Sequence, residues 1–228
     1  MNVLAFDTCF GACSAAILWN GQLTWRYEEM ATGQAERLIP MIGEVLDQSG
    51  ASLRDLDTIA VTEGPGTFTG TRVGVAAARG LALATGLPIR ATTSLHVMAY
   101  RAISELGEAA AGSVLAVCVD ARGGKVFVQV FELQATEPLT QATVMAPDAA
   151  AALEAPAPLL CVGSGGLSVS EAARRAGREA EAKLPTLQPD ARYLARLAAS
   201  LPVRDPLVPL YLRPPDAKPQ TGKSLPRA

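Results

Sequence analysis

The sequence predicts an α/β fold of two lobes, the second of them shortened. Strand-length apolar runs and helix-periodic stretches alternate through residues 1–107 in the order βββαβαβα. A similar order begins again after residue 108, as a repeat of pattern without sequence identity. The chain has 228 residues, of which 49% are hydrophobic, so each lobe has enough apolar side chains to bury a core.

Five strands are expected in the first lobe. Residues 2–7 (NVLAFD) read as a buried strand, and residues 12–18 and 22–28 read as the next two. Asn20 and Gly21 between them are typical of a two-residue hairpin turn. Two more strands are expected at residues 57–64 and 88–92.

Three helices complete this lobe. Apolar side chains recur at helical spacing over residues 34–50, where Gly50 ends the helix. Pro40 predicts either a start near Leu38 or a kink. Two further helices are expected over residues 70–85 and 94–106. A hairpin-led sheet followed by right-handed crossovers is the RNase H-like arrangement.

The second lobe repeats this arrangement in a shorter form. Residues 113–133 read as a strand, a glycine-rich turn and a strand, and residues 158–166 as a strand followed by a glycine turn. A further strand and three helices are expected at 139–145, 147–155, 168–182 and 190–200. Two such lobes back to back resemble the actin, sugar-kinase and chaperone ATPase superfamily.

These elements divide the chain into three parts. An N-terminal lobe covers residues 1–107, and a shortened C-terminal lobe covers residues 108–213, its last segment packing back on the first. Residues 214–228 contain four prolines and no apolar periodicity, which predicts a disordered tail.

Composition narrows the class of protein. The formal net charge is −2, so no global basic field favours direct binding of nucleic acid. The first residues lack the basic start of a signal peptide, and Asp7 interrupts their apolar run. No apolar run reaches the length of a membrane span, so a cytoplasmic protein without membrane contact is expected.

Cysteine and histidine usage argues against most metal chemistry. The four cysteines are Cys9, Cys13, Cys118 and Cys161, and they read as buried, reduced thiols, although Cys9 and Cys13 have a spacing that zinc would tolerate. His96 is the single histidine, so this chain alone cannot build a zinc protease motif or a site with two histidines.

The segment GPGTFTGTRVGVAAARGLALATG (64–86) allows two interpretations. Its glycines allow a tight turn before a helix, as in phosphate loops, but the lysine of a Walker loop is missing. The helix that follows is apolar on every side and carries two lines of small residues: Gly70, Gly74, Ala78 and Ala76, Gly80, Ala84. A sheet covers one face only, so the other face needs a cover from this chain or from another subunit.

The subunit interpretation predicts a four-helix interface built from this helix and the helix at 34–49. The residues expected to form it are Leu38, Ile42, Val45, Gly70, Val73, Gly74, Ala77, Ala78 and Leu81.

Five segments together resemble the TsaB (YeaZ) family over residues 3–215: LAFDTCFGACSAAIL, AERLIPMIGEVL, GPGTFTGTRVGVAAARGLALATGLP, VDARGGKVF and PLYLRPP. The resemblance implies a non-catalytic relative of the TsaD subunit. With TsaD and the ATPase TsaE, such proteins serve tRNA N6-threonylcarbamoyladenosine synthesis. It further implies a scaffold that binds TsaD or a second copy of itself, requires no cofactor, has no activity alone, and meets tRNA only within the complex.

One departure and one residual feature bear on catalysis. Gln34 stands where the family usually has histidine, so the chain cannot reproduce the histidine pair that holds metal in TsaD. Asp7 and Asp120 stand where the superfamily's nucleotide-binding aspartates lie, and the glycine turn (Gly163, Gly165, Gly166) matches the adenosine side. These residues allow weak ATP and magnesium binding. The alternative is that they only stabilise turns inherited from the superfamily fold.

The sequence leaves two other functions as alternatives. An active ATPase or kinase of the same superfamily would use Asp7, Asp120 and the 163–166 glycines. A peptidase would need a metal site or a nucleophile–base pair, and the sequence offers neither. Arg174, Arg175 and Arg178 alternate with glutamates, as on a solvated helix face, and a contact with tRNA is the alternative.

Overall fold

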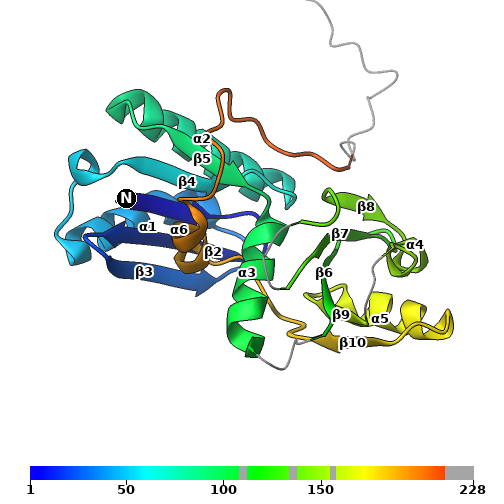
Figure 1. The fold of residues 1–228 in the computed structure, drawn as a ribbon. Coiled ribbons are helices and arrows are strands. Elements are labelled where there is room, and N and C mark those ends of the chain that lie inside the picture. Colours follow the sequence, from blue (N-terminus) through cyan, green and yellow to red (C-terminus); the bar gives the residue numbers. More distant parts are fainter. Residues whose placement is uncertain (108–111, 134–137, 155–157, 214–228) are drawn as a thin grey trace, which may run out of the picture.

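The computed structural model describes residues 1–107, 112–133, 138–154 and 158–213, so the predicted tail at 214–228 lies outside it. Two five-stranded mixed sheets form the two lobes (Figure 1). The first has the order β3-β2-β1-β4-β5 and the second the order β10-β9-β6-β7-β8. This arrangement confirms the predicted two-lobe α/β fold of the RNase H-like, sugar-kinase type.

The first sheet follows the predicted order closely. Its strands are β1 Val3–Asp7, β2 Ala12–Trp19, β3 Gln22–Glu29, β4 Thr58–Thr62 and β5 Ile89–Thr92. The first three are antiparallel neighbours, and β4 and β5 run parallel to β1. Asn20 and Gly21 both have positive φ, 49° and 78°, as the two-residue hairpin turn requires.

Helices cover both faces of this sheet. Helices α1 (Gln34–Ser49) and α2 (Phe68–Thr85) pack on the face that carries Leu4 and Phe6. Helices α3 (Ser94–Leu106) and α6 (Ala191–Leu197) pack on the opposite face, against Val3 and Ala5. Successive side chains of a strand point to opposite faces of the sheet, so alternate residues of β1 belong to two different cores. A short 3-10 helix, Leu53–Asp55, precedes β4.

Helix α1 settles the alternatives at Pro40. The helix begins at Gln34 and continues past Pro40 to Ser49, so a start near Leu38 is excluded. Gly50 ends it in the left-handed conformation, with its N–H donating to the Leu46 carbonyl at 3.0 Å.

The second lobe corrects one helix prediction. Its strands and helices are β6 Val114–Asp120, β7 Val126–Phe131, β8 Thr143–Met145, α4 Pro147–Ala151, β9 Leu159–Val162, α5 Gly166–Arg175 and β10 Ala180–Lys183. The helix expected over 168–182 is wrong, because α5 ends at Arg175 and Gly177 takes a positive φ of 79°. Residues 180–183 instead pair with β9, which overrides the helix propensity of their alanines and glutamate.

The chain returns to the first lobe after β10. Helix α6 covers the first sheet, and residues 201–213 then run past β5 and the start of α2 (Figure 1). Val203 forms a bridge with Arg90, and the N–H of Leu210 donates to the Glu63 carbonyl at 2.6 Å. None of the helices described is both long and apolar enough to cross a membrane.

Candidate functional site

The glycine-rich loop packs against the segment that follows β1. The N–H of Thr67 donates to the Cys9 carbonyl at 2.7 Å, and the Thr8 hydroxyl donates to the Gly70 carbonyl at 2.7 Å. A Cβ on Gly66 would overlap the Cys9 carbonyl, and one on Gly70 would overlap the Thr8 carbonyl. The loop glycines are therefore required by close backbone packing inside the lobe, which accounts for them without a phosphate.

Asp7 lies fully buried at the end of β1. The Thr62 hydroxyl donates to its Oδ2, and the N–H of Cys9 donates to its Oδ1 at 3.2 Å. Burial raises the pKa of Asp7 from 3.8 to about 6, although these hydrogen bonds favour the ionised form. Burial beside Asp7 also raises the pKa of the Cys9 thiol. A carboxylate enclosed in this way has no open side for a hydrated cation.

The second-lobe candidates also have structural partners. Asp120 is exposed at the end of β6, where its Oδ1 accepts the Arg122 N–H at 2.8 Å. A Cβ on Gly163 would lie 2.5 Å from the Cys118 carbonyl, and one on Gly165 would lie 2.7 Å from Val126 Cγ1. A Cβ on Gly166 would lie 3.2 Å from the Cys161 backbone. This turn packs tightly on its own sheet instead of leaving a surface for a base.

Apolar side chains fill the junction between the lobes beside these aspartates. Phe10, just after β1, lies with its ring centroid 6.2 Å from that of Phe127 on β7. Cys9, Val119, Ala121 and Leu187 join the same buried cluster. An apolar junction of this kind does not suit a triphosphate or its magnesium ion, so the described residues do not fit the nucleotide group that the fold suggests.

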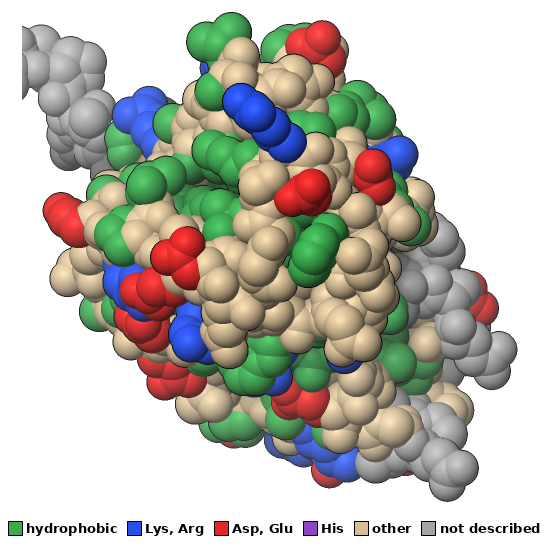
Figure 2. Space-filling model, turned by 90° about the vertical axis from the view of Figure 1, so that its left-hand side faces the viewer, with side chains coloured by type: hydrophobic (Ala, Val, Ile, Leu, Met, Phe, Trp, Pro, Cys, Tyr) green, Lys and Arg blue, Asp and Glu red, His purple; other side chains and the backbone are tan. Residues whose placement is uncertain are grey.

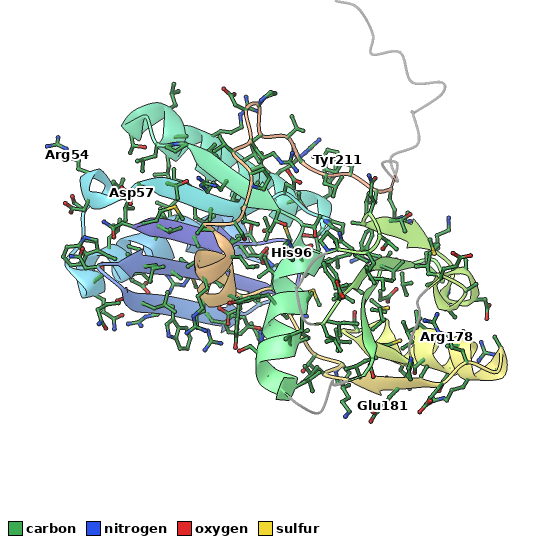
Figure 3. The ribbon with its side chains drawn as sticks, viewed as in Figure 1. Arg54, Asp57, His96, Arg178, Glu181 and Tyr211 are labelled. Carbon is green, nitrogen blue, oxygen red and sulfur yellow. The ribbon has the colours of Figure 1, made fainter. Side chains whose placement is uncertain are left out.

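His96 lies at this junction too (Figure 3). Its Nδ1 is 2.8 Å from the Thr92 hydroxyl oxygen, and its ring stacks on Phe131 at 5.6 Å between centroids. The four cysteines lie buried as free thiols. Within the ranges the structure describes, no group of three or more histidine, cysteine or acidic side chains is arranged to hold a metal ion.

Gln34 has a role that the sequence did not reveal. Its side chain is almost fully buried, and its Nε2 donates to the carbonyls of Phe10 and Met30 at 3.1 Å each. These two hydrogen bonds connect the start of α1 to the segment before β2 and to the residue that follows β3.

The arginines at the end of α5 and just after it contact their own lobe. Arg178 donates to the carbonyls of Ala151 and Leu153, at 3.1 and 2.8 Å (Figure 3). Arg174 donates to the Ala180 carbonyl at 3.3 Å, and Arg175 pairs with Asp148 at 3.2 Å. This arrangement favours a structural and solvated role for the three side chains.

The expected interface set needs correction. Six of its residues are buried inside the first lobe, so they are not available to a partner: Leu38, Ile42, Val45, Gly70, Gly74 and Ala78. Gly74, for example, leaves room for the Thr8 hydroxyl, which a Cβ there would approach to 2.9 Å. Val73, Ala77 and Leu81 are partly exposed along one side of α2.

The other line of small residues faces outward. Ala76, Gly80 and Ala84 are exposed, and no atom lies within 4 Å of a Cβ built on Gly80. Leu83 between them is 90% exposed. We call Ala76, Gly80, Leu83 and Ala84 the α2 ridge. Figure 2, which faces this end of the first lobe, shows hydrophobic side chains lying between the charged ones. The sequence contained this signal as the second small-residue line.

Neighbouring apolar side chains extend the exposed surface of this helix layer. Ile39 of α1 is 56% exposed. At the start of α2, Phe68 stacks on Tyr211 at 5.6 Å between centroids, and the Arg72 guanidinium lies 3.6 Å from the Phe68 centroid. The stack brings residues 143 positions apart together, which no local pattern in the sequence could have indicated.

Comparisons with known proteins match this chain to a TsaD family profile and to TsaB and YeaZ proteins. A family profile described as "TsaD: tRNA N6-adenosine threonylcarbamoyltransferase" matches residues 28–187. The Escherichia coli "tRNA threonylcarbamoyladenosine biosynthesis protein TsaB" is 41% identical over 128 residues, 56% of this chain and 53% of that protein. The match thus spans about half the length of this curated relative.

Two longer matches cover nearly the whole chain. An uncharacterized Mycobacterium tuberculosis protein is 34% identical over 226 residues, 96% of this chain and 94% of its own. The solved structure "YeaZ from Pseudomonas aeruginosa" superposes with a TM-score of 0.78 at 30% identity, covering 92% of this chain and 99% of that one.

Proposed function

Because the chain belongs to the TsaB (YeaZ) family, we propose that it serves N6-threonylcarbamoyladenosine biosynthesis in tRNA as a non-catalytic scaffold subunit. In this role it binds a TsaD-like catalytic subunit through the exposed surface of α1 and α2, and it pairs with a second copy when alone. A TsaE-like ATPase joins the same assembly. The net charge of −2 supports contact with tRNA through the complex and not through this chain alone.

The observation that carries the proposal is the α2 ridge. Helix α2 carries only two charged side chains, Arg72 and Arg79, and both are exposed, yet the apolar residues Ala76, Leu83 and Ala84 are also exposed on its outer face. Gly80 and the alanines beside it allow another helix to approach closely, while Leu83 on α2 and Ile39 on α1 add exposed apolar area. Two parallel layers of two helices form the four-helix contact that suits such a surface.

Placing a charge on the ridge is expected to abolish partner binding without unfolding the chain. Ala84→Arg and Gly80→Arg should weaken binding of the TsaD-like subunit by about 30-fold or more, because hot-spot changes at an interface core cost about 2 kcal/mol or more. Calorimetry gives the affinity, and light scattering gives the mass of the chain alone.

The matched control is Ala149→Arg, an exposed alanine on α4 in the other lobe, which should leave binding unchanged. Thermal unfolding of all three variants should stay close to that of the wild type. Undiminished binding by both ridge variants would reject the proposed interface.

We further propose that this role needs no nucleotide bound to the isolated chain. The buried Asp7, the tightly packed glycine turn and the apolar Phe10–Phe127 contact support this. Titration with ATP and magnesium up to about 1 mM should therefore give no saturable heat. Any binding would then have a dissociation constant above about 1 mM, which corresponds to a binding free energy weaker than about 4 kcal/mol. Saturable binding that Asp120→Ala abolishes would instead favour the ATPase or kinase hypothesis.

A further inference from the structure

Two aromatic side chains orient Arg72, an exposed arginine near the start of α2. Its guanidinium lies 3.6 Å from the Phe68 ring centroid, and its Nε donates to the Tyr211 hydroxyl at 2.6 Å. The Phe68 and Tyr211 rings stack with an angle of 27° between their planes. A planar guanidinium that is already held in this way loses little freedom when it binds a further group.

The segment that carries Tyr211 is itself fixed to the first lobe (Figure 3). Leu207 is buried in the core of that lobe, and the N–H of Leu210 donates to the Glu63 carbonyl at 2.6 Å. The hydroxyl that orients Arg72 therefore comes from a residue 139 positions away, which tertiary packing places beside α2.

The Arg72 guanidinium has no acidic partner. Among the residues that the structure describes, no carboxylate forms an ion pair with it, and its two Nη groups have no hydrogen-bond acceptor. Three other arginines that donate to side chains, Arg37, Arg101 and Arg192, each pair with a carboxylate of this chain. Arg72 is thus oriented to bind an anion that the described part of the chain does not supply.

We propose that Arg72 binds a carboxylate of the TsaD-like subunit, at the Phe68 end of the α2 interface. This inference rests on the proposed function. Exposed residues recur every four positions along one side of α2: Arg72, Ala76, Gly80 and Ala84. The partner helix that packs on the α2 ridge therefore presents small or apolar residues along the ridge and an aspartate or glutamate at its end.

The composition of α2 argues against a second copy of this chain as the occupant. The helix contains Arg72 and Arg79 and no acidic residue. Two such helices that face each other across a two-fold axis bring only positive charges together, which is unfavourable. A partner with an acidic residue on its helix has the complementary charge.

A carboxylate suits this guanidinium better than a phosphate of tRNA does. The Nε of Arg72 is occupied by Tyr211, which leaves the two Nη groups as a fork, and a planar carboxylate accepts two parallel N–H groups. Surfaces that bind nucleic acid gather many basic side chains, whereas this chain has a net charge of −2.

Arg72→Gln is expected to weaken binding of the TsaD-like subunit about tenfold or more, because hydrogen bonds between charged groups are the strong ones at an interface. The wild-type affinity should fall as NaCl rises from about 0.05 M to about 0.5 M, and the variant should show a smaller decrease. Calorimetry measures both.

Arg54→Gln is the matched control. It removes the same charge from the short 3-10 helix, at the opposite end of the first lobe from Tyr211 (Figure 3). Its affinity and salt dependence should equal those of the wild type. Thermal unfolding of the Arg72→Gln and Arg54→Gln chains should also stay close to that of the wild type.

Tyr211→Phe tests whether the hydroxyl positions Arg72. The ring remains and the acceptor for Nε is lost, so affinity should fall about threefold. In a chain that already carries Arg72→Gln, the same change should have no further effect, because the hydroxyl acts through the guanidinium. Equal losses in the two backgrounds would refute this positioning role.

Covalent coupling identifies the carboxylate. Arg72→Lys places an amine at this position, and a carbodiimide joins an amine to a carboxylate in contact with it, forming an amide with loss of water. Mass spectrometry of the coupled peptides should find an aspartate or glutamate of the TsaD-like subunit joined to position 72. The same treatment of Arg54→Lys should give no such product.

The inference fails if Arg72→Gln leaves affinity and salt dependence unchanged, or lowers only the affinity of the assembled complex for tRNA. It also fails if Arg72→Lys couples to Glu36 or Asp47 of a second copy, or to Asp216 of its own chain. Its failure is distinguishable from that of the proposed function. In the first case Ala84→Arg still disrupts binding of the subunit, and in the second case Ala84→Arg leaves that binding intact.

Discussion

Replacing Gly70 by alanine is expected to lower the free energy of unfolding by about 3 kcal/mol, the upper range for overpacking a rigid interior. The added Cβ would overlap the Thr8 carbonyl and lie 2.7 Å from the Thr67 hydroxyl oxygen. Neither neighbour moves easily, because the Thr8 hydroxyl donates to the Gly70 carbonyl and Thr67 caps α2. Urea unfolding measures the loss, and the melting temperature should fall by about 10 °C.

Gly80, on the same helix, is the matched control. Nothing lies within 4 Å of its added Cβ, so Gly80→Ala should raise the free energy of unfolding by about 1 kcal/mol through helix propensity. The two glycine-to-alanine changes thus have opposite signs. Equal effects at both positions would contradict the packing of the loop on Thr8.

Replacing Asp7 by asparagine is expected to stabilise the protein near neutral pH by up to about 3 kcal/mol. That figure follows from a pKa raised from 3.8 to about 6, at about 1.4 kcal/mol for each unit. An amide can still accept the Cys9 N–H and can donate to the Thr62 hydroxyl, so the hydrogen bonds need not be lost.

The pH dependence has a definite sign. Because the folded pKa of Asp7 lies above the unfolded value, the folded chain binds more protons between pH 3.8 and 6. The contribution of Asp7 to stability is therefore fully present below pH 3.8 and is lost as the pH rises through 6. The advantage of Asp7→Asn should appear over this window and stay constant above it.

Thermal unfolding of wild type and Asp7→Asn at pH 4, 6 and 8 measures this window. Asp120→Asn removes a charge from an exposed side chain and serves as the control for net charge. If Asp7→Asn is destabilising at pH 8, the carboxylate has a favourable role there that burial alone does not describe.

Local pattern in the sequence was enough for most of the fold. Strand-length apolar runs identified β1 and β2, and Asn20 with Gly21 predicted the turn that both residues make with positive φ. Helix periodicity located α1 and α2, and the repeat of pattern indicated the second lobe. The resemblance then supplied the family, which the comparisons support.

Tertiary structure decided which side of each element is used. The sequence showed two small-residue lines on α2, and only the position of Thr8, 62 residues from Gly70, buries one line and exposes the other. Pairing with β9 turned a helix-favouring segment into β10. The periodicity of a helix or strand tells which residues share a face. Whether that face is buried depends on what the rest of the chain packs against it, and those contacts are distant in sequence.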